Sequence, residues 1–340
     1  MIAHKIQKSQ EHFGNLFAPK KAVSFLRLFV ILLFFAFFSA LFQDTPAGNV
    51  MAVSRTDTLQ NSYQDLCIPT YLTKVHDLYF LVDCYHDQII YNDNLIDPLN
   101  EWLVMTDEIS KGHTLASDGT VYLADDTERN RILVFEKKGE IFIHTQTFHD
   151  IGNRPHYIIY DEPTDTFYAW SSLSGEMYLF RHPSNSRHMF LAQVRRIKAL
   201  DNIYVRSFTI IGDEIYFVSG NSSIIRADLK SFKILETYPV PDDIAGMIQL
   251  TKIQDYFYIT VSTDITGSQE YATILRTKDL KSLAKGRYED IYTQFIGGGT
   301  PYYITCLDDG YYLTEHRLPD HSVWRFQVKD NMIQNIETIY

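Results

Sequence analysis

The pattern of apolar and polar positions repeats six times between residues 69 and 338. Each unit reads as a strand, a tight turn, an aromatic-rich strand, a loop, and a third strand whose apolar cluster precedes a charged turn. In the first unit these segments are PTYLTKV (69–75), DLYFLVD (77–83) and QIIYND (88–93). Short runs rich in aromatic and β-branched residues, bounded by Asp, Asn and Gly, are typical of β-strands. The pattern therefore predicts an all-β domain.

The spacing of the units predicts how these strands are organised. The second strands align on one aromatic residue each: Phe80, Tyr122, Tyr168, Tyr216, Tyr258 and Tyr312. Successive intervals are about 42, 46, 48, 42 and 54 residues, which is the spacing of propeller blades. A weaker fourth strand follows in every unit, for example IFIHTQTF (141–148). Six four-stranded units predict a six-bladed β-propeller over residues 66–340, since a sandwich of irregular strands gives no reason for a sixfold repeat.

The mode of ring closure is left open by the sequence. The first and last units both contain a full set of strand patterns, so neither needs a strand from the other terminus. The segment VMAVS (50–54) has the composition of an additional edge strand.

The N-terminal region has a different pattern. Residues 28–42 form an uncharged apolar run after a basic tail (1–27), which is the flank expected on the cytoplasmic side of a membrane segment. Its insertion is favourable by roughly 5 kcal/mol. We expect a signal anchor or a cleavable signal peptide, followed by a polar linker (43–65). The propeller is then outside the cytoplasm, either on a single-pass anchor with a cytoplasmic N-terminus or secreted.

The composition argues against nucleic acid as a partner and against a fold held together by disulfides. The net charge of −11 would repel a nucleic-acid backbone, and no Lys/Arg stripe reverses it locally. Three cysteines, Cys67, Cys84 and Cys306, are too few for a disulfide scaffold. The hairpin of the first unit brings Cys67 and Cys84 near each other, so a bond between them stays open, although three free thiols are the favoured interpretation.

One unit resembles a known repeat. The segment DGTVYLADDTERNRILVFEKKGE (118–140) is similar to the NHL repeat: a Gly-containing turn, an aromatic strand ending in Ala-Asp, a polar loop with Asn and Arg, and an apolar third strand. The resemblance implies a six-bladed propeller for the chain. It does not choose a function, because such propellers include lyases, lactonases, receptors and protein-binding modules.

Ligands of propellers usually bind where the inner strands begin, around one mouth of the central channel. Mapping the repeat onto that ring, together with the ends of the second strands, predicts ligand-binding residues at Tyr71, His113, His156, Arg206, Gln249, Tyr302 and Glu315. His113 and His156 occupy equivalent positions in adjacent units, so they are also candidate metal ligands. The alternative is that each imidazole hydrogen-bonds to a backbone carbonyl or to water.

No complete catalytic constellation is present in the sequence. GxSxG, HExxH and P-loop motifs are absent, and we assign no catalytic residue and no cofactor. The sequence therefore favours a membrane-associated binding or scaffold module that holds a protein, peptide or glycan at its channel mouth. The alternative is a metal-assisted lyase or hydrolase in which His113 and His156 hold the metal while Arg206 and Tyr302 orient an anionic substrate.

Overall fold

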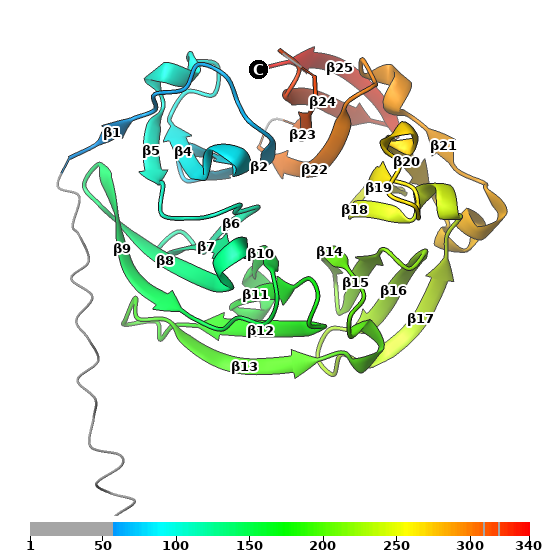
Figure 1. The fold of residues 1–340 in the computed structure, drawn as a ribbon, viewed down its shortest axis with the longest axis horizontal. Helices are drawn as coiled ribbons and strands as arrows, with labels where there is room; N and C mark the ends of the chain where they lie inside the picture. The colour runs from blue at the N-terminus through cyan, green and yellow to red at the C-terminus, as the bar shows by residue number, and fades with distance from the viewer. Residues whose placement is uncertain (1–56, 309, 319) are drawn as a thin grey trace, which may run out of the picture. The chain divides into compact units, whose positions relative to one another are not determined.

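The computed structural model describes residues 57–308, 310–318 and 320–340, and these form one compact unit. Six antiparallel sheets surround a central axis (Figure 1). The predicted six-bladed all-β propeller is confirmed. The basic tail (1–27), the apolar run (28–42) and the segment 50–54 lie outside the described residues. Within the described ranges, no helix has the length and apolar character needed to span a membrane.

Each blade is built from strands that are consecutive in the chain. Blade 1 contains β1 (Leu59–Gln60), β2 (Pro69–Val75), β3 (Leu78–Asp83), β4 (Gln88–Asn92) and β5 (Leu103–Thr106). Blade 2 contains β6 (Leu115–Ser117), β7 (Tyr122–Asp126), β8 (Arg131–Lys138) and β9 (Ile141–Phe148). Blade 3 contains β10 (Pro155–Asp161), β11 (Thr166–Ser171), β12 (Glu176–Arg181) and β13 (Phe190–Arg196).

The second half of the ring repeats this order. Blade 4 contains β14 (Val205–Ile211), β15 (Glu214–Ser219), β16 (Ser223–Asp228) and β17 (Ile234–Pro239). Blade 5 contains β18 (Gly246–Ile253), β19 (Tyr256–Thr263), β20 (Thr273–Thr277) and β21 (Glu289–Asp290). Blade 6 contains β22 (Thr300–Leu307), β23 (Gly310–His316), β24 (Val323–Lys329) and β25 (Met332–Thr338).

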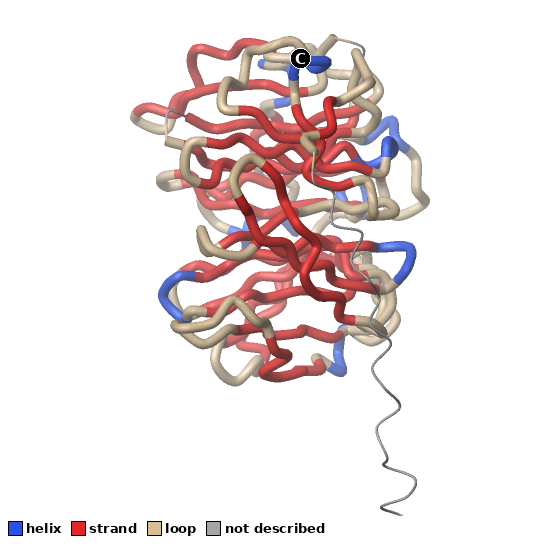
Figure 2. Tube along the Cα trace, turned by 90° about the vertical axis from the view of Figure 1, so that its left-hand side faces the viewer, coloured by secondary structure: helices blue, strands red, loops and turns tan. Residues whose placement is uncertain are grey.

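Short 3₁₀ helices lie in the connections between strands (Figure 2). In the described residues they span Cys84–His86, Leu99–Glu101, Thr127–Arg129, Glu162–Thr164, Lys198–Leu200, Asp242–Ile244, Gln269–Tyr271, Leu280–Lys285 and Tyr292–Gln294. The last of these shortens the fourth strand expected in blade 5. The side chain of Asp290 accepts a hydrogen bond from the main-chain N–H of Tyr292 at 2.9 Å, a local turn that ends the strand.

The rim strand is the least buried strand of each blade. Every residue of β7 and β11 is buried, whereas nearly every residue of the rim strand β13 is exposed. At the rim of blade 1, β1 adds a fifth strand by pairing Leu59 with Val104. Part of the segment predicted as linker (43–65) thus packs on blade 1, and Asn61 donates its side-chain amide to Leu99 O at 2.9 Å.

Neighbouring blades are held together by apolar clusters, one in each of the six interfaces among the described residues. The cluster between blades 1 and 2, for example, packs Phe80 against Tyr122 and Phe142 with ring centroids 5.4 and 5.5 Å away. The equivalent clusters contain Phe180 (blades 2–3), Trp170 and Phe217 (3–4), Ile259 (4–5), Trp324 (5–6) and Trp102 (6–1). Large buried aromatic residues at these positions explain the high Phe and Tyr content of the chain.

Hydrogen bonds between a side chain and the main chain also cross every interface, close to the channel. They join Thr70 Oγ1 to His113 O, Ile158 N to Thr114 Oγ1, Trp170 Nε1 to Val205 O, Ser207 Oγ to Ile248 O, Thr260 Oγ1 to Tyr302 O and Thr314 Oγ1 to Thr70 O, over 2.6–3.2 Å. Because inner strands of different blades do not pair as a sheet, these bonds satisfy main-chain groups that would otherwise be buried without partners.

The ring closes without exchanging a strand between its ends. Tyr340, after the last strand, places its hydroxyl against blade 1, where the single O–H proton is shared between Leu95 O at 2.5 Å and Asp97 O at 2.6 Å, and the oxygen accepts from Trp102 Nε1 at 3.0 Å. The three cysteines are all free, with Cys84 buried and Cys306 exposed.

Candidate functional site

Two histidines from adjacent blades meet at the mouth of the channel. His113 lies in the loop before β6, and His156 is the second residue of β10. Their rings stack with centroids 3.7 Å apart and planes 26° apart. The equivalent positions in the repeat therefore bring the two imidazoles together.

A buried carboxylate fixes the backbone at His113. Asp125 at the end of β7 is fully buried, and it accepts hydrogen bonds from the main-chain N–H of His113 at 2.9 Å and of Thr114 at 2.7 Å. The hydroxyls of Thr114 and Thr127 also donate to it, at 2.9 and 2.8 Å. Because these four donors bond to its carboxylate, Asp125 holds the loop before β6 in position.

The imidazole of His156 is held by two tyrosine hydroxyls and is almost completely buried. Its Nδ1 lies 3.4 Å from Tyr303 Oη and its Nε2 lies 3.3 Å from Tyr204 Oη. Burial, and then the nearby positive groups of His113, Arg206 and Arg154, hold the pKa of His156 well below its usual value. The ring is therefore neutral at neutral pH.

Tyr302 and His316 extend this layer from blade 6. The ring of Tyr302 lies 6.0 Å from that of His113 and 5.8 Å from that of His316. Burial, followed by the charges of Arg317, Arg206 and His113, lowers the pKa of His316 to about 4. Its Nδ1 is buried and makes no hydrogen bond within the described part of the chain.

Arg206 brings a fixed positive charge to the mouth. Its guanidinium lies 5.3 Å from the centroid of the Tyr204 ring and donates a hydrogen bond to Ser262 Oγ. We define the mouth cluster as His113, His156, Tyr204, Arg206, Tyr302 and His316. It combines imidazole, aromatic and guanidinium groups from blades 2, 3, 4 and 6 and from the loop before blade 4.

Three residues predicted at the mouth are engaged elsewhere. Tyr71 packs edge-on against Tyr303 at 5.9 Å, and burial raises its pKa to about 12. Gln249 donates to Ile304 O at 3.1 Å and accepts from Ile304 N at 2.7 Å. Both line a separate cavity of about 220 Å³.

The third is Glu315, which is fully buried. It accepts hydrogen bonds from Tyr292 Oη and, at 2.8 Å, from Trp324 Nε1, and burial raises its pKa. The structure thus brings His113, His156, Arg206 and Tyr302 together but not Tyr71, Gln249 or Glu315.

The structure does not add a third metal ligand to the histidine pair. Among the described residues, no group of three or more His, Cys, Asp or Glu side chains is arranged to hold a metal ion. The nitrogens of His113 also have protein neighbours, with Nδ1 3.1 Å from Thr127 Oγ1 and Nε2 4.0 Å from Cys84 Sγ. A metal bound by His113 and His156 stays a prediction.

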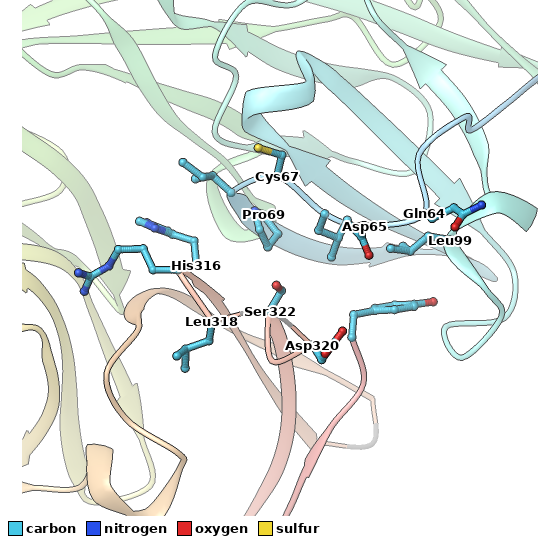
Figure 3. A pocket seen from close by; sticks show the side chains of 13 residues that line it. Gln64, Asp65, Cys67, Pro69, Leu99, His316, Leu318, Asp320 and Ser322 are labelled. Atoms are coloured by element: carbon cyan, nitrogen blue, oxygen red, sulfur yellow. The ribbon is translucent and has the colours of Figure 1, made fainter.

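A cleft adjoins the mouth cluster between blades 6 and 1. It has a volume of about 580 Å³, within the range of small-molecule sites. Figure 3 shows His316 and Leu318 on the blade 6 side facing Cys67 and Pro69 of blade 1, with Asp65 and Asp320 farther along. Because His316 belongs to both, the blade 6–blade 1 cleft continues the mouth.

Sequence reasoning missed Tyr204 and assigned no role to His316. Tyr204 lies in the loop before β14, one residue outside the repeated strand pattern. His316 directly follows Glu315, which was the predicted residue. In both cases the available signal was an aromatic or imidazole side chain beside a predicted position.

Comparison with solved structures shows the fold alone. A 6-phosphogluconolactonase-like protein from Bacteroides uniformis has 12% identity and a TM-score of 0.56, over 81% of this chain and 85% of that one. Virginiamycin B lyase from Staphylococcus aureus, solved with quinupristin, has 17% identity and a TM-score of 0.54, over 83% and 88%. The WD40 propeller domain of Doa1 has 13% identity and a TM-score of 0.51, over 83% and 85%.

No protein-family model matches the chain, and no curated protein matches it. The solved structures range from enzymes to a WD40 domain, so the likeness does not select an activity. The comparisons therefore support the β-propeller fold, and any function is inferred from the residues of this chain.

Proposed function

We propose that the chain is a binding or scaffold propeller that holds a protein, peptide or glycan ligand at its channel mouth. In this proposal the propeller is NHL-like and works outside the cytoplasm, and residues 28–42 associate it with a membrane. The NHL-like unit at 118–140 and the basic flank of the apolar run support these two parts.

The mouth cluster is the observation that carries the proposal. Tyr204, Arg206 and Tyr302 belong to residue types that are enriched among the side chains dominating binding energy at interfaces. Tyr204 and Arg206 are partly exposed, while His156 behind them is buried, so the accessible groups rest on a rigid layer. A rigid polar and aromatic surface that continues into a cleft favours binding, because little side-chain entropy is lost when a ligand docks.

The metal-assisted lyase or hydrolase receives no comparable support. A catalytic zinc site needs three protein ligands and an open position, and the described residues supply the histidine pair without a third ligand. Asp125, the nearest carboxylate to His113 at 3.8 Å, is already satisfied by four donors.

A binding screen with matched aromatic variants tests the proposal. The full chain in detergent micelles is applied to arrays of defined peptides and oligosaccharides as wild type, Tyr204→Ala and Phe190→Ala. Phe190 is an exposed aromatic residue on the rim of blade 3 and serves as the control. We expect ligands retained by wild type and Phe190→Ala to be lost by Tyr204→Ala. Ligands bound equally by all three, or no ligand on either array, would contradict the proposal.

A further inference from the structure

Two of the three arginines near the mouth have no ion-pair partner among the described residues. Arg154 is paired with Glu128 at 2.7 Å. Arg206 and Arg317 instead make their hydrogen bonds to neutral groups, namely Ser262 Oγ for Arg206, and Gln269 Oε1 and Gly299 O for Arg317. Within the ranges that the structure describes, neither has a carboxylate at ion-pair distance.

The carboxylates nearest to the mouth are held by other donors and form no ion pair with Arg206. Asp125 is fully buried beneath four donors, and Glu315 is fully buried between Tyr292 and Trp324. Neither side chain can turn toward Arg206 without leaving these buried donors unsatisfied, which is costly.

We propose that the channel mouth binds an oxyanion of its ligand, a carboxylate or a phosphate group, with Arg206 as the charged anchor. The inference rests on the proposed function, because it names the chemistry of the group that the mouth receives. An anion at this point would give Arg206 the charged partner that the described residues do not supply.

The geometry of Arg206 suits this role. The contact with the Tyr204 ring and the bond to Ser262 hold the guanidinium in place, and Ser262 is itself held by a bond to Gly246 O at 3.1 Å. A guanidinium has five N–H donors in a rigid fork that matches carboxylate and phosphate. The bond to Ser262 uses one of the five N–H donors, so most of the fork remains for a ligand.

The surroundings reinforce the preference for an anion. The net charge of the chain is −11, so its average field repels anions. At the mouth, however, positive groups lie close together: burial first, and then Arg206 together with Arg154 or Arg317, lowers the pKa values of His156 and His316. We therefore infer that the mouth favours negative groups although the chain as a whole is acidic.

The blade 6–blade 1 cleft gives space for the rest of the ligand. It begins at His316 and Arg317, and its walls include the apolar side chains of Leu66, Ile68 and Leu318. We therefore infer an apolar group next to the oxyanion, since this part of the cleft offers few charged partners.

Binding of two paired probes to the full chain tests the inference. N-acetyl-leucine and N-acetyl-leucinamide share an apolar body and differ in the carboxylate, and inorganic phosphate tests the other oxyanion. Calorimetric titrations are run at constant ionic strength on wild type, Arg206→Gln and Arg181→Gln. Arg181 is the matched control, because like Arg206 it donates to a hydroxyl, Thr166 Oγ1 at 2.8 Å, and its other bond is to a neutral group, Thr164 O at 3.1 Å.

We expect N-acetyl-leucine or phosphate to bind saturably, and Arg206→Gln to weaken that binding roughly tenfold or more, the loss typical of a charge-assisted hydrogen bond. Arg181→Gln should bind like wild type, and the amide should bind more weakly than the acid. Preference for phosphate or for N-acetyl-leucine identifies the oxyanion. If Arg206→Gln does not retain the wild-type circular dichroism, Arg206→Lys replaces it and should also bind more weakly, since it loses the fork.

Equal binding by wild type and Arg206→Gln, or no saturable binding of either oxyanion, would overturn the inference. Its failure is distinguishable from failure of the proposed function. A neutral ligand whose binding is lost in Tyr204→Ala but kept in Arg206→Gln would support the mouth as the binding site and contradict only the inference that the ligand carries an oxyanion.

Discussion

The substitution Gln249→Leu tests whether side chains stabilise the propeller by bonding to the main-chain groups at the edges of the inner strands. The two hydrogen bonds of Gln249 to Ile304 connect blade 5 to blade 6 inside the channel. Leucine has a similar size but cannot donate or accept. It therefore leaves the N–H and C=O of Ile304 buried and without their partner.

The expected loss of stability follows from the two main-chain groups of Ile304 that lose their partner. Leaving a buried polar group unsatisfied costs about 1–3 kcal/mol, so two groups cost roughly 2–5 kcal/mol once the gain from a buried apolar side chain is included. For a domain of this size, this lowers the midpoint of thermal unfolding by roughly 4–10 °C. Oxyanion binding at the mouth should be unchanged, because Gln249 lies in the other cavity.

The chain contains two matched controls for this experiment. Gln146 makes the same pair of bonds to Met189, at 3.0 and 2.7 Å, in a partly buried position between blades 2 and 3. Gln254 bonds to Val328 O and Asn331 N between blades 5 and 6 but is exposed. In differential scanning calorimetry, the midpoint of thermal unfolding should fall most for Gln249→Leu, less for Gln146→Leu and least for Gln254→Leu. A loss for Gln249→Leu no larger than for Gln254→Leu would refute the reasoning.

Three further predictions follow from other contacts. Burial lowers the pKa of His182, but the bond between its imidazole and Asp118, at 2.5 Å, outweighs burial and raises the pKa above 6.5. The protonated imidazole therefore stabilises the fold below about pH 6.5, and this stabilisation is lost as the pH rises through the higher pKa of the folded state. His182→Asn should reduce that alkaline loss in urea titrations, and the exposed His188→Asn should not. Tyr340→Phe removes the hydroxyl that closes the ring and should cost roughly 1–3 kcal/mol in urea unfolding, whereas the exposed Tyr271→Phe should cost almost nothing. A chain starting at residue 57 should be soluble with circular dichroism dominated by β structure, while the full chain should fractionate with membranes; a cytosolic full chain would contradict the role given to residues 28–42.

The sequence predicted the blades because the repeated pattern encodes them locally. The alternation of apolar residues and the turn residues fix each hairpin, and the aligned aromatic residues from Phe80 to Tyr312 are buried as expected. The meeting of His113 and His156 was also predictable, since equivalent positions in adjacent blades point into the same channel.

Side-chain partners across blades were not predictable in the same way. Gln249 occupies a mouth position in the repeat, but its partner is the main chain of Ile304, 55 residues later, and the sequence does not encode how adjacent blades are aligned. Glu315 ends its strand at the mouth face, yet Tyr292 and Trp324 enclose it. Tyr204 was missed because it belongs to a loop that the repeat does not include.

An experimental structure of the full chain with a saturating oxyanion probe tests the role of Arg206 most directly. We expect phosphate or N-acetyl-leucine within hydrogen-bond distance of Arg206, beside Tyr204 and His316, with any apolar group directed into the blade 6–blade 1 cleft. A probe bound elsewhere, with none at Arg206, would contradict the assignment of the mouth as the binding site.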